Sequence, residues 1–88
     1  MTLTQLKIFI TVAELGNVTK AAERLGLTQS AASAAIAAIE NTYQVKLFER
    51  VGRSVELSET GKRFLPEAQS TVRSARTTVR NLRSLSGK

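Results

Sequence analysis

The sequence contains no cysteine and no histidine, so any chemistry would have to come from seven carboxylates, one tyrosine and the basic residues. That composition excludes thiol chemistry and the usual zinc ligands, and it removes the commonest general base. We therefore predict a protein that is not an enzyme, with no catalytic residue, no metal site and no cofactor. The polar side chains of most interest, Gln29 and Ser33, are four positions apart, so they would share one face of a helix.

A helix that begins near Gln29 would expose a face of small and polar side chains: Gln29, Ser30, Ser33, Ala34 and Ala37. Glutamine can form paired hydrogen bonds with adenine N6 and N7, and serine can contact any base edge or a phosphate. Alanine can only touch a thymine methyl group, as Ala34 could do here. For Ala37 and Ala38 we prefer the simpler explanation that alanine is the strongest helix former.

The segment that carries these residues, 19–40, predicts two helices joined by a tight turn. Its sequence, TKAAERLGLTQSAASAAIAAIE, has Gly26 where a left-handed residue can end the first helix, and Thr28 where a hydroxyl can cap the second. Two helices joined by a short glycine-containing turn are typical of a helix-turn-helix, whose second helix enters the DNA major groove. Taken alone, the segment is equally compatible with an ordinary helical hairpin.

The chain is basic, with 13 Lys and Arg against 7 Asp and Glu and a formal net charge of +6. This balance favours a polyanionic partner, with nucleic acid ahead of a membrane. Helix N-termini attract anions, so Thr19, Lys20 and Thr28 are candidate phosphate contacts. No apolar run is long enough to span a membrane, and the start MTLTQLK does not resemble a secretory signal. We therefore expect a cytoplasmic protein.

The other segments of the N-terminal part predict a frame around the two helices. Residues 4–15 carry apolar side chains at helical spacing, and the helix that starts near Gln29 would have a buried side of its own. That side would consist of Ala32, Ile36, Ile39 and Tyr43. Residues 47–57 change to an extended pattern, with Gly52 at the turn of a short hairpin. The sequence therefore predicts a mainly α, winged helix-turn-helix head over residues 1–57.

Two arginines flank the turn of the predicted hairpin. Arg53, near the tip, suits a narrow A/T-rich minor groove with its concentrated negative potential. Arg50 could contact a phosphate, but it could also pair with an acid such as Glu49 or Glu40. Both interpretations of Arg50 stay open.

Residues 58–88 predict a long helix that begins at Ser58 and runs to about Ser84. Its apolar residues follow a heptad pattern with spacings of three and four: Leu65, Ala68, Val72, Ala75, Val79 and Leu82. A small head cannot cover so long a stripe, so we expect these residues to meet a second copy and form a homodimer. The alternative is packing against a missing part of the same protein. The final SLSGK is typical of a linker or a truncation point.

Nearly the whole chain resembles the N-terminal DNA-binding domain of LysR-type transcriptional regulators. The resemblance is carried by LTQLKIFITVAELGNVTKAAERLGLTQSAASAAI and by IENTYQVKLFERVGRSVELSETGKRFLPEA. These stretches contain the Leu-x-x-Phe of the first helix, T-x-A-A-x-x-L of the second, a Thr-Gln pair with a serine four residues later, L-F-x-R and L-S-x-x-G. The resemblance implies a winged helix-turn-helix that dimerises through antiparallel linker helices. It also implies a larger effector-binding domain beyond this chain, which would then be a fragment.

The resemblance places Gln29 and Ser33 at positions that contact DNA, so it implies sequence-specific binding of a double-stranded operator. Five residues depart from the usual pattern. Ala32 replaces a bulky aliphatic residue, Ser30 a frequent proline, and Ala34 a common basic residue or histidine. Ala37 and Ala38 stand at positions that are often polar or basic in the family. These changes leave the helix with fewer groups that can read bases. The alternative function, from a different class, is a protein-interaction module in which the long helix is the working part.

Overall fold

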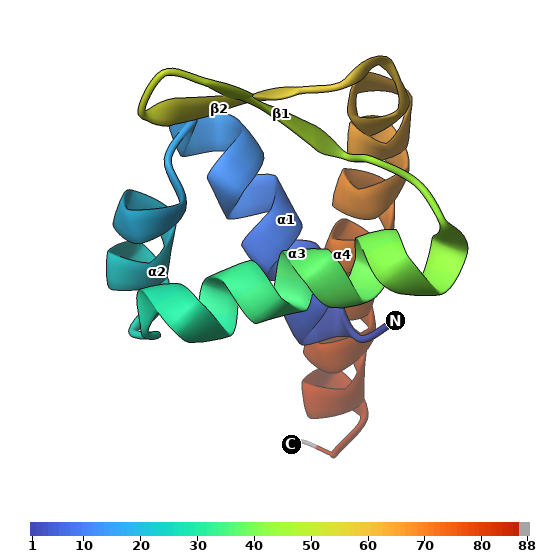
Figure 1. Ribbon diagram of the computed structural model, residues 1–88. Coiled ribbons are helices and arrows are strands. Elements are labelled where there is room, and N and C mark those ends of the chain that lie inside the picture. The colour runs from blue at the N-terminus through green and yellow to red at the C-terminus, as the bar shows by residue number, and fades with distance from the viewer. Residues whose placement is uncertain (87–88) are drawn as a thin grey trace.

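Four helices and one β-hairpin make up the part of the chain described by this computed structural model, residues 1–86 (Figure 1). The elements are α1 (Leu3–Leu15), α2 (Val18–Leu25), α3 (Gln29–Tyr43), β1 (Phe48–Val51), β2 (Ser54–Leu57) and α4 (Glu59–Ser86). The last two residues of the predicted linker, 87–88, lie outside the described residues. The predicted mainly α, winged helix-turn-helix fold is confirmed.

The first helix begins and ends at residues suited to those positions. Thr2 caps α1 through a capping box, in which its Oγ1 accepts a hydrogen bond from Gln5 N and Gln5 Oε1 accepts one from Thr2 N. The helix ends at Gly16, whose φ of 65° is left-handed and costs glycine little. The caps at Thr2 and Gly16 set the length of α1, and the turn at Gly16 directs the chain into α2.

The core is built around α1. Phe9 and Val12 on this helix are fully buried, and the ring of Phe9 packs between two other aromatic rings. Its centroid lies 5.4 Å from that of Phe48, at the start of β1, and 5.2 Å from that of Phe64, in α4. The rings are tilted, as aromatic pairs prefer. The hairpin and the long helix are therefore both anchored to α1.

The third helix buries Ala32, Ile36 and Ile39, as predicted, but it leaves Tyr43 51% exposed. The prediction that Tyr43 belongs to the core is wrong. Tyr43 is the last residue of α3, and the chain turns away at Gln44, which adopts a left-handed φ of 53°. The ring therefore lies at the edge of the core rather than inside it.

The hairpin is a two-stranded antiparallel sheet in which Arg50 pairs with Val55 and Val51 with Ser54. Gly52, with a φ of 61°, stands at the turn as the sequence predicts. Val55 N donates a hydrogen bond of 3.0 Å to Gly16 O, so β2 is tied to the turn between α1 and α2. This bond fixes the hairpin over the helix-turn-helix (Figure 1).

The fourth helix continues through Pro66 as one helix and extends beyond the other elements at its C-terminal end (Figure 1). Its apolar stripe is divided. Ala68 and Val72 are 1% and 4% exposed in the core of this chain, whereas Val79 and Leu82 are 49% and 63% exposed. Leu65 and Ala75 are half-buried. This corrects the expectation that the whole stripe faces a second copy, because Ala68 and Val72 are buried in the core of this chain. Among residues 1–86, no helix has the length and apolarity needed to cross a membrane.

Candidate nucleic-acid interface

The turn between α2 and α3 sets the start of the candidate reading helix. Gly26 ends α2 with a φ of 71°, and Leu27 N donates a hydrogen bond of 2.9 Å to Ala22 O. Thr28 then caps α3, because its Oγ1 accepts a hydrogen bond of 3.1 Å from Ala31 N. Gln29 is the first residue of α3, as predicted. The cap therefore fixes Gln29 in the first turn of the helix.

The predicted face of α3 is largely open to solvent. Gln29, Ser30, Ala34 and Ala37 are exposed, while Ser33 is half-buried. Gln29 Nε2 donates a hydrogen bond of 2.8 Å to Ser33 Oγ one turn further along the helix. The two polar residues that the sequence singled out are thus brought together and hydrogen-bonded to each other.

The candidate phosphate contacts lie at two helix N-termini. Thr19 and Lys20 are exposed in the first turn of α2. Asn17 caps this helix, and its Oδ1 accepts a hydrogen bond of 2.8 Å from Lys20 N. That backbone donor is therefore used within the protein, which leaves the Lys20 ammonium and the Thr19 hydroxyl to meet an anion. Thr28 at the start of α3 is also exposed.

The two arginines of the hairpin are both exposed, with Arg50 in β1 and Arg53 in the turn. The ion pair found within residues 1–86 is Arg24 with Glu14, so Arg50 has no carboxylate within pairing distance in this part of the chain. Glu40 has a different role, since its Oε2 accepts hydrogen bonds from Leu47 N at 2.7 Å and from Phe48 N at 3.4 Å. The structure does not support the alternative in which Arg50 pairs with Glu40 or Glu49.

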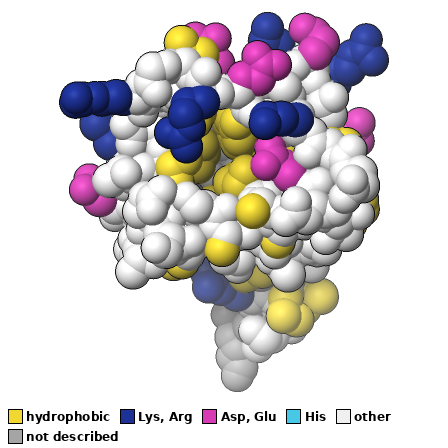
Figure 2. Space-filling model, viewed as in Figure 1, with side chains coloured by type: hydrophobic (Ala, Val, Ile, Leu, Met, Phe, Trp, Pro, Cys, Tyr) yellow, Lys and Arg dark blue, Asp and Glu magenta, His cyan; other side chains and the backbone are white. Residues whose placement is uncertain are grey.

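A hollow of about 250 Å³ separates α3 from the hairpin. Figure 2 shows hydrophobic side chains inside it and both basic and acidic side chains around its edge. Its lining residues are Val18, Ser33, Ile36, Ala37, Glu40, Lys46, Phe48, Glu49, Arg50 and Val55. Lys46 is a cation at this edge that the sequence analysis missed, because nothing in its local sequence links it to α3. Residues of α3 and of the hairpin line the hollow together, so the two elements share one surface.

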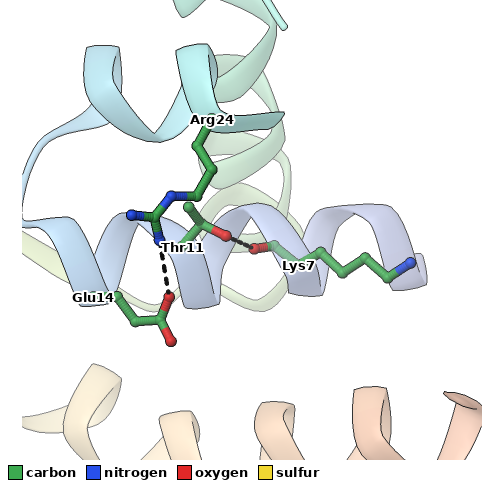
Figure 3. Close-up of polar contacts among 4 residues, drawn as sticks. All are labelled: Lys7, Thr11, Glu14 and Arg24. Carbon is green, nitrogen blue, oxygen red and sulfur yellow. Dashed lines mark hydrogen bonds and ion pairs between the residues drawn. The ribbon is translucent and has the colours of Figure 1, made fainter. Parts of the chain in front are cut away.

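The helices α2 and α3 both pack against α1. Arg24 of α2 reaches Glu14 of α1, with 3.8 Å between Nη1 and Oε1 (Figure 3). The hydrogen bond of 2.8 Å that Thr11 Oγ1 donates to Lys7 O, also drawn in Figure 3, lies within α1. Both side chains of the ion pair are more than half exposed, and such pairs typically add only about 0–1 kcal/mol to the free energy of unfolding. The position of α2 therefore depends mainly on its buried alanines, Ala21 and Ala22.

Known proteins share this arrangement. Residues 3–62 match the family described as bacterial regulatory helix-turn-helix protein, lysR family. An uncharacterized HTH-type transcriptional regulator from the ibpB-leuC intergenic region of Azotobacter vinelandii is 47% identical over 87 residues, which are 99% of this chain and 60% of that relative. YvbU, an uncharacterized HTH-type transcriptional regulator of Bacillus subtilis, is 50% identical over 66 residues, which are 74% of this chain and 23% of YvbU. This chain is thus much shorter than either relative.

The fold is also found in a solved structure. The chain superposes on the crystal structure of the CbnR_DBD–DNA complex with a TM-score of 0.91 at 36% identity, over 99% of this chain and 100% of that chain. The relatives are transcriptional regulators rather than enzymes. The chain therefore belongs to the LysR family of bacterial regulatory helix-turn-helix proteins, as the DNA-binding domain of a transcriptional regulator.

Proposed function

We propose that this domain binds a specific double-stranded DNA sequence as a homodimer, with α3 in the major groove and the hairpin in the minor groove. The observation that carries the proposal is the composition of the exposed face of α3. Gln29 offers groups that pair with a base edge, while Ala34 and Ala37 are exposed and too small to hold the helix away from the groove floor. A helix of about 10–12 Å diameter matches a major groove about 12 Å wide.

The cations around α3 fit the phosphates on either side of that groove. Lys20, Lys46 and Arg50 are exposed near α3, and the Thr19 and Thr28 hydroxyls can add neutral contacts. Phosphate contacts fix the register of a protein on DNA without reading its sequence. Three cations in each head give six in the proposed dimer.

The proposed dimer uses the part of the α4 stripe that this chain leaves uncovered. Val79 and Leu82 are exposed, and Ala75 is half-buried. Leu3 of α1, which is 43% exposed, lines a groove together with Val72, Ala75 and Val79. Exposed apolar side chains gathered in this way mark interaction surfaces. A second copy related by a twofold axis would cover both stripes at once. The longer relatives suggest a longer parent regulator, in which a further domain would bind an effector ligand.

The proposal is tested by selecting bound sequences from random duplex DNA and then titrating salt. If about six phosphates are contacted, affinity for the selected site should fall about a thousandfold or more between about 50 and about 200 mM salt. Selected sites should contain two related half-sites. A domain that recovers no preferred sequence and binds no duplex at low salt would instead be a protein-interaction module, and the proposal would be wrong.

A further inference from the structure

The groove between α1 and α4, which the proposed dimer would cover, is lined by four cations: Lys7, Arg76, Arg80 and Arg83. All four residues are exposed, and within residues 1–86 none of them has a carboxylate within ion-pairing distance. The sequence itself has no Asp or Glu after Glu67. The charge beside the apolar stripe of α4 is therefore of a single sign.

The charge is also confined to one side of the stripe. Arg76 and Arg83 are seven residues apart, at equivalent positions of the heptad pattern, so they share one flank of α4. We call these two residues the arginine flank. The corresponding positions on the other side of the stripe hold Thr71 and Thr78, which are neutral.

The direction of the partner helix decides which flanks meet in a twofold dimer. A twofold axis that crosses the two helices makes them antiparallel and brings each flank against the same flank of the partner. A twofold axis along the helices makes them parallel and brings opposite flanks together. The antiparallel pair covers more apolar surface, because it carries the exposed Leu82 of one copy toward the exposed Leu3 of the other. A parallel pair would place the two Leu82 side chains together and leave Leu3 uncovered.

We propose that dimerisation of this domain is coupled to the uptake of anions, because two arginine flanks face each other across the interface. The inference rests on the proposed function, in which α4 forms the dimer. Like charges then meet unless small anions enter between them. Added salt screens such charges, since the Debye length falls from about 30 Å at about 0.01 M to about 3 Å at about 1 M. The dimer therefore tightens as salt rises, whereas phosphate contacts to DNA weaken.

The first experiment measures the dimer dissociation constant without DNA, by sedimentation equilibrium at about 0.05 and about 0.5 M NaCl. The wild-type dimer should tighten about tenfold over this range. Arg76→Gln/Arg83→Gln should be about tenfold tighter than the wild type at the lower salt and should change little with salt. The matched control is Lys62→Gln/Arg63→Gln, which removes the same charge from exposed positions in the first turns of α4, away from the groove. It should keep the wild-type salt dependence.

The second experiment swaps the charge of the arginine flank. Arg76→Glu/Arg83→Glu should repel its own copy as the wild type does, but its flank should attract the wild-type flank. In a mixture with fluorescently labelled wild type at about 0.05 M NaCl, the heterodimer should exceed the statistical proportion about tenfold, and the excess should disappear at about 0.5 M. A parallel pair would bring the altered residues against Thr71 and Thr78 and would give no preference. Circular dichroism checks that each variant folds.

The outcomes separate this inference from the proposed function. A wild-type dimer that weakens or stays constant as salt rises, or a mixture without excess heterodimer, would overturn the uptake of anions and leave the dimer intact. Equal tightening in Arg76→Gln/Arg83→Gln and in the Lys62→Gln/Arg63→Gln control would also overturn it, because the effect would then come from the overall net charge. A wild-type protein that stays monomeric at every salt concentration would overturn both this inference and the proposed homodimer.

Discussion

Arg53 sits beside Gly52 in the turn of the hairpin, with its side chain exposed and no acid paired with it in the described part of the chain. The geometry of the turn explains this exposure. Gly52 takes the left-handed conformation that the turn needs, so Arg53 stands beside it at the tip without having to adopt that conformation. A cation at a tip can enter a groove that is too narrow for a helix.

At this residue scale we predict that Arg53→Ala weakens binding mainly where the flanks of the site are A/T-rich. The narrow minor groove of such flanks concentrates negative potential, so it gains most from an inserted arginine. Fluorescence anisotropy with A/T-rich and G/C-rich flanks measures the difference. Arg73→Ala removes the same charge from the exposed surface of α4 and is the control. Equal losses on both kinds of flank would remove the hairpin tip from the proposed minor-groove contact.

The base of the hairpin is held between two helices. Glu40 of α3 accepts hydrogen bonds from Leu47 N and Phe48 N, and Ser58 N, just before α4, donates one of 2.9 Å to Leu47 O. The Ser58 hydroxyl donates to Lys46 O and accepts from Gly61 N. The segment from Lys46 to Phe48 is therefore fixed on both sides, which holds the hairpin at a set distance from α3.

At the element scale, Gly61→Ala should destabilise the fold by about 1–3 kcal/mol. At an open helix position the same change would stabilise by about 1 kcal/mol, because alanine favours helix. Here a Cβ would collide with Leu47 O and lie 2.9 Å from Leu57 Cδ2, so the overpacking term dominates. Chemical denaturation followed by circular dichroism gives the sign. Ser70→Ala, at an exposed position of α4, is the control and should change stability little. A Gly61→Ala protein more stable than the wild type would contradict this tight packing.

The elements that the sequence predicted well are those whose ends depend on local chemistry. Gly26 and Thr28 form caps that use only neighbouring residues, so the end of α2 and the start of α3 followed from the sequence. The positions of Tyr43 and Glu40 depend on where α3 ends relative to α1 and to the base of the hairpin. That is a tertiary property, and no local pattern in the sequence contains it.

The distinction between features set by neighbouring residues and features set by tertiary packing also applies to the whole molecule. Heptad spacing predicted the apolar stripe of α4 correctly, but spacing cannot say which partner covers each part. Ala68 and Val72 are covered by the head of this chain, whereas Val79, Leu82 and Leu85 are not. Among the residues proposed to contact DNA, Gln29 and Ser33 followed from the sequence and the family resemblance. Lys46 did not, since it reaches the site only through the tertiary position of the segment that precedes β1.

At the scale of the whole molecule, Val79→Asp with Leu82→Asp should convert the proposed dimer to monomers while the fold stays intact. The two substitutions would place charges in the exposed half of the stripe. In a dimer these charges would be buried and unpaired, which opposes association. Sedimentation velocity gives the oligomeric state, and circular dichroism checks the fold. The control is Thr78→Asp, at an exposed position beside the stripe. Val72→Asp is unsuited to this test because Val72 is in the core and its loss would unfold the monomer. A double variant that stays dimeric would show that the interface lies elsewhere.

The burial of Val72 in the core has a mechanical consequence. Phe64, Ala68 and Val72 pack α4 against the head, so the part of the helix that projects is residues 73–86, and these 14 residues give an arm about 21 Å long. A rotation of about 10° at Val72 would displace the far end by about 4 Å, close to the rise of about 3.4 Å per base pair. The packing around Val72 would therefore decide whether the two heads of the proposed dimer, joined near the far ends of these arms, stay in step with the turns of the double helix.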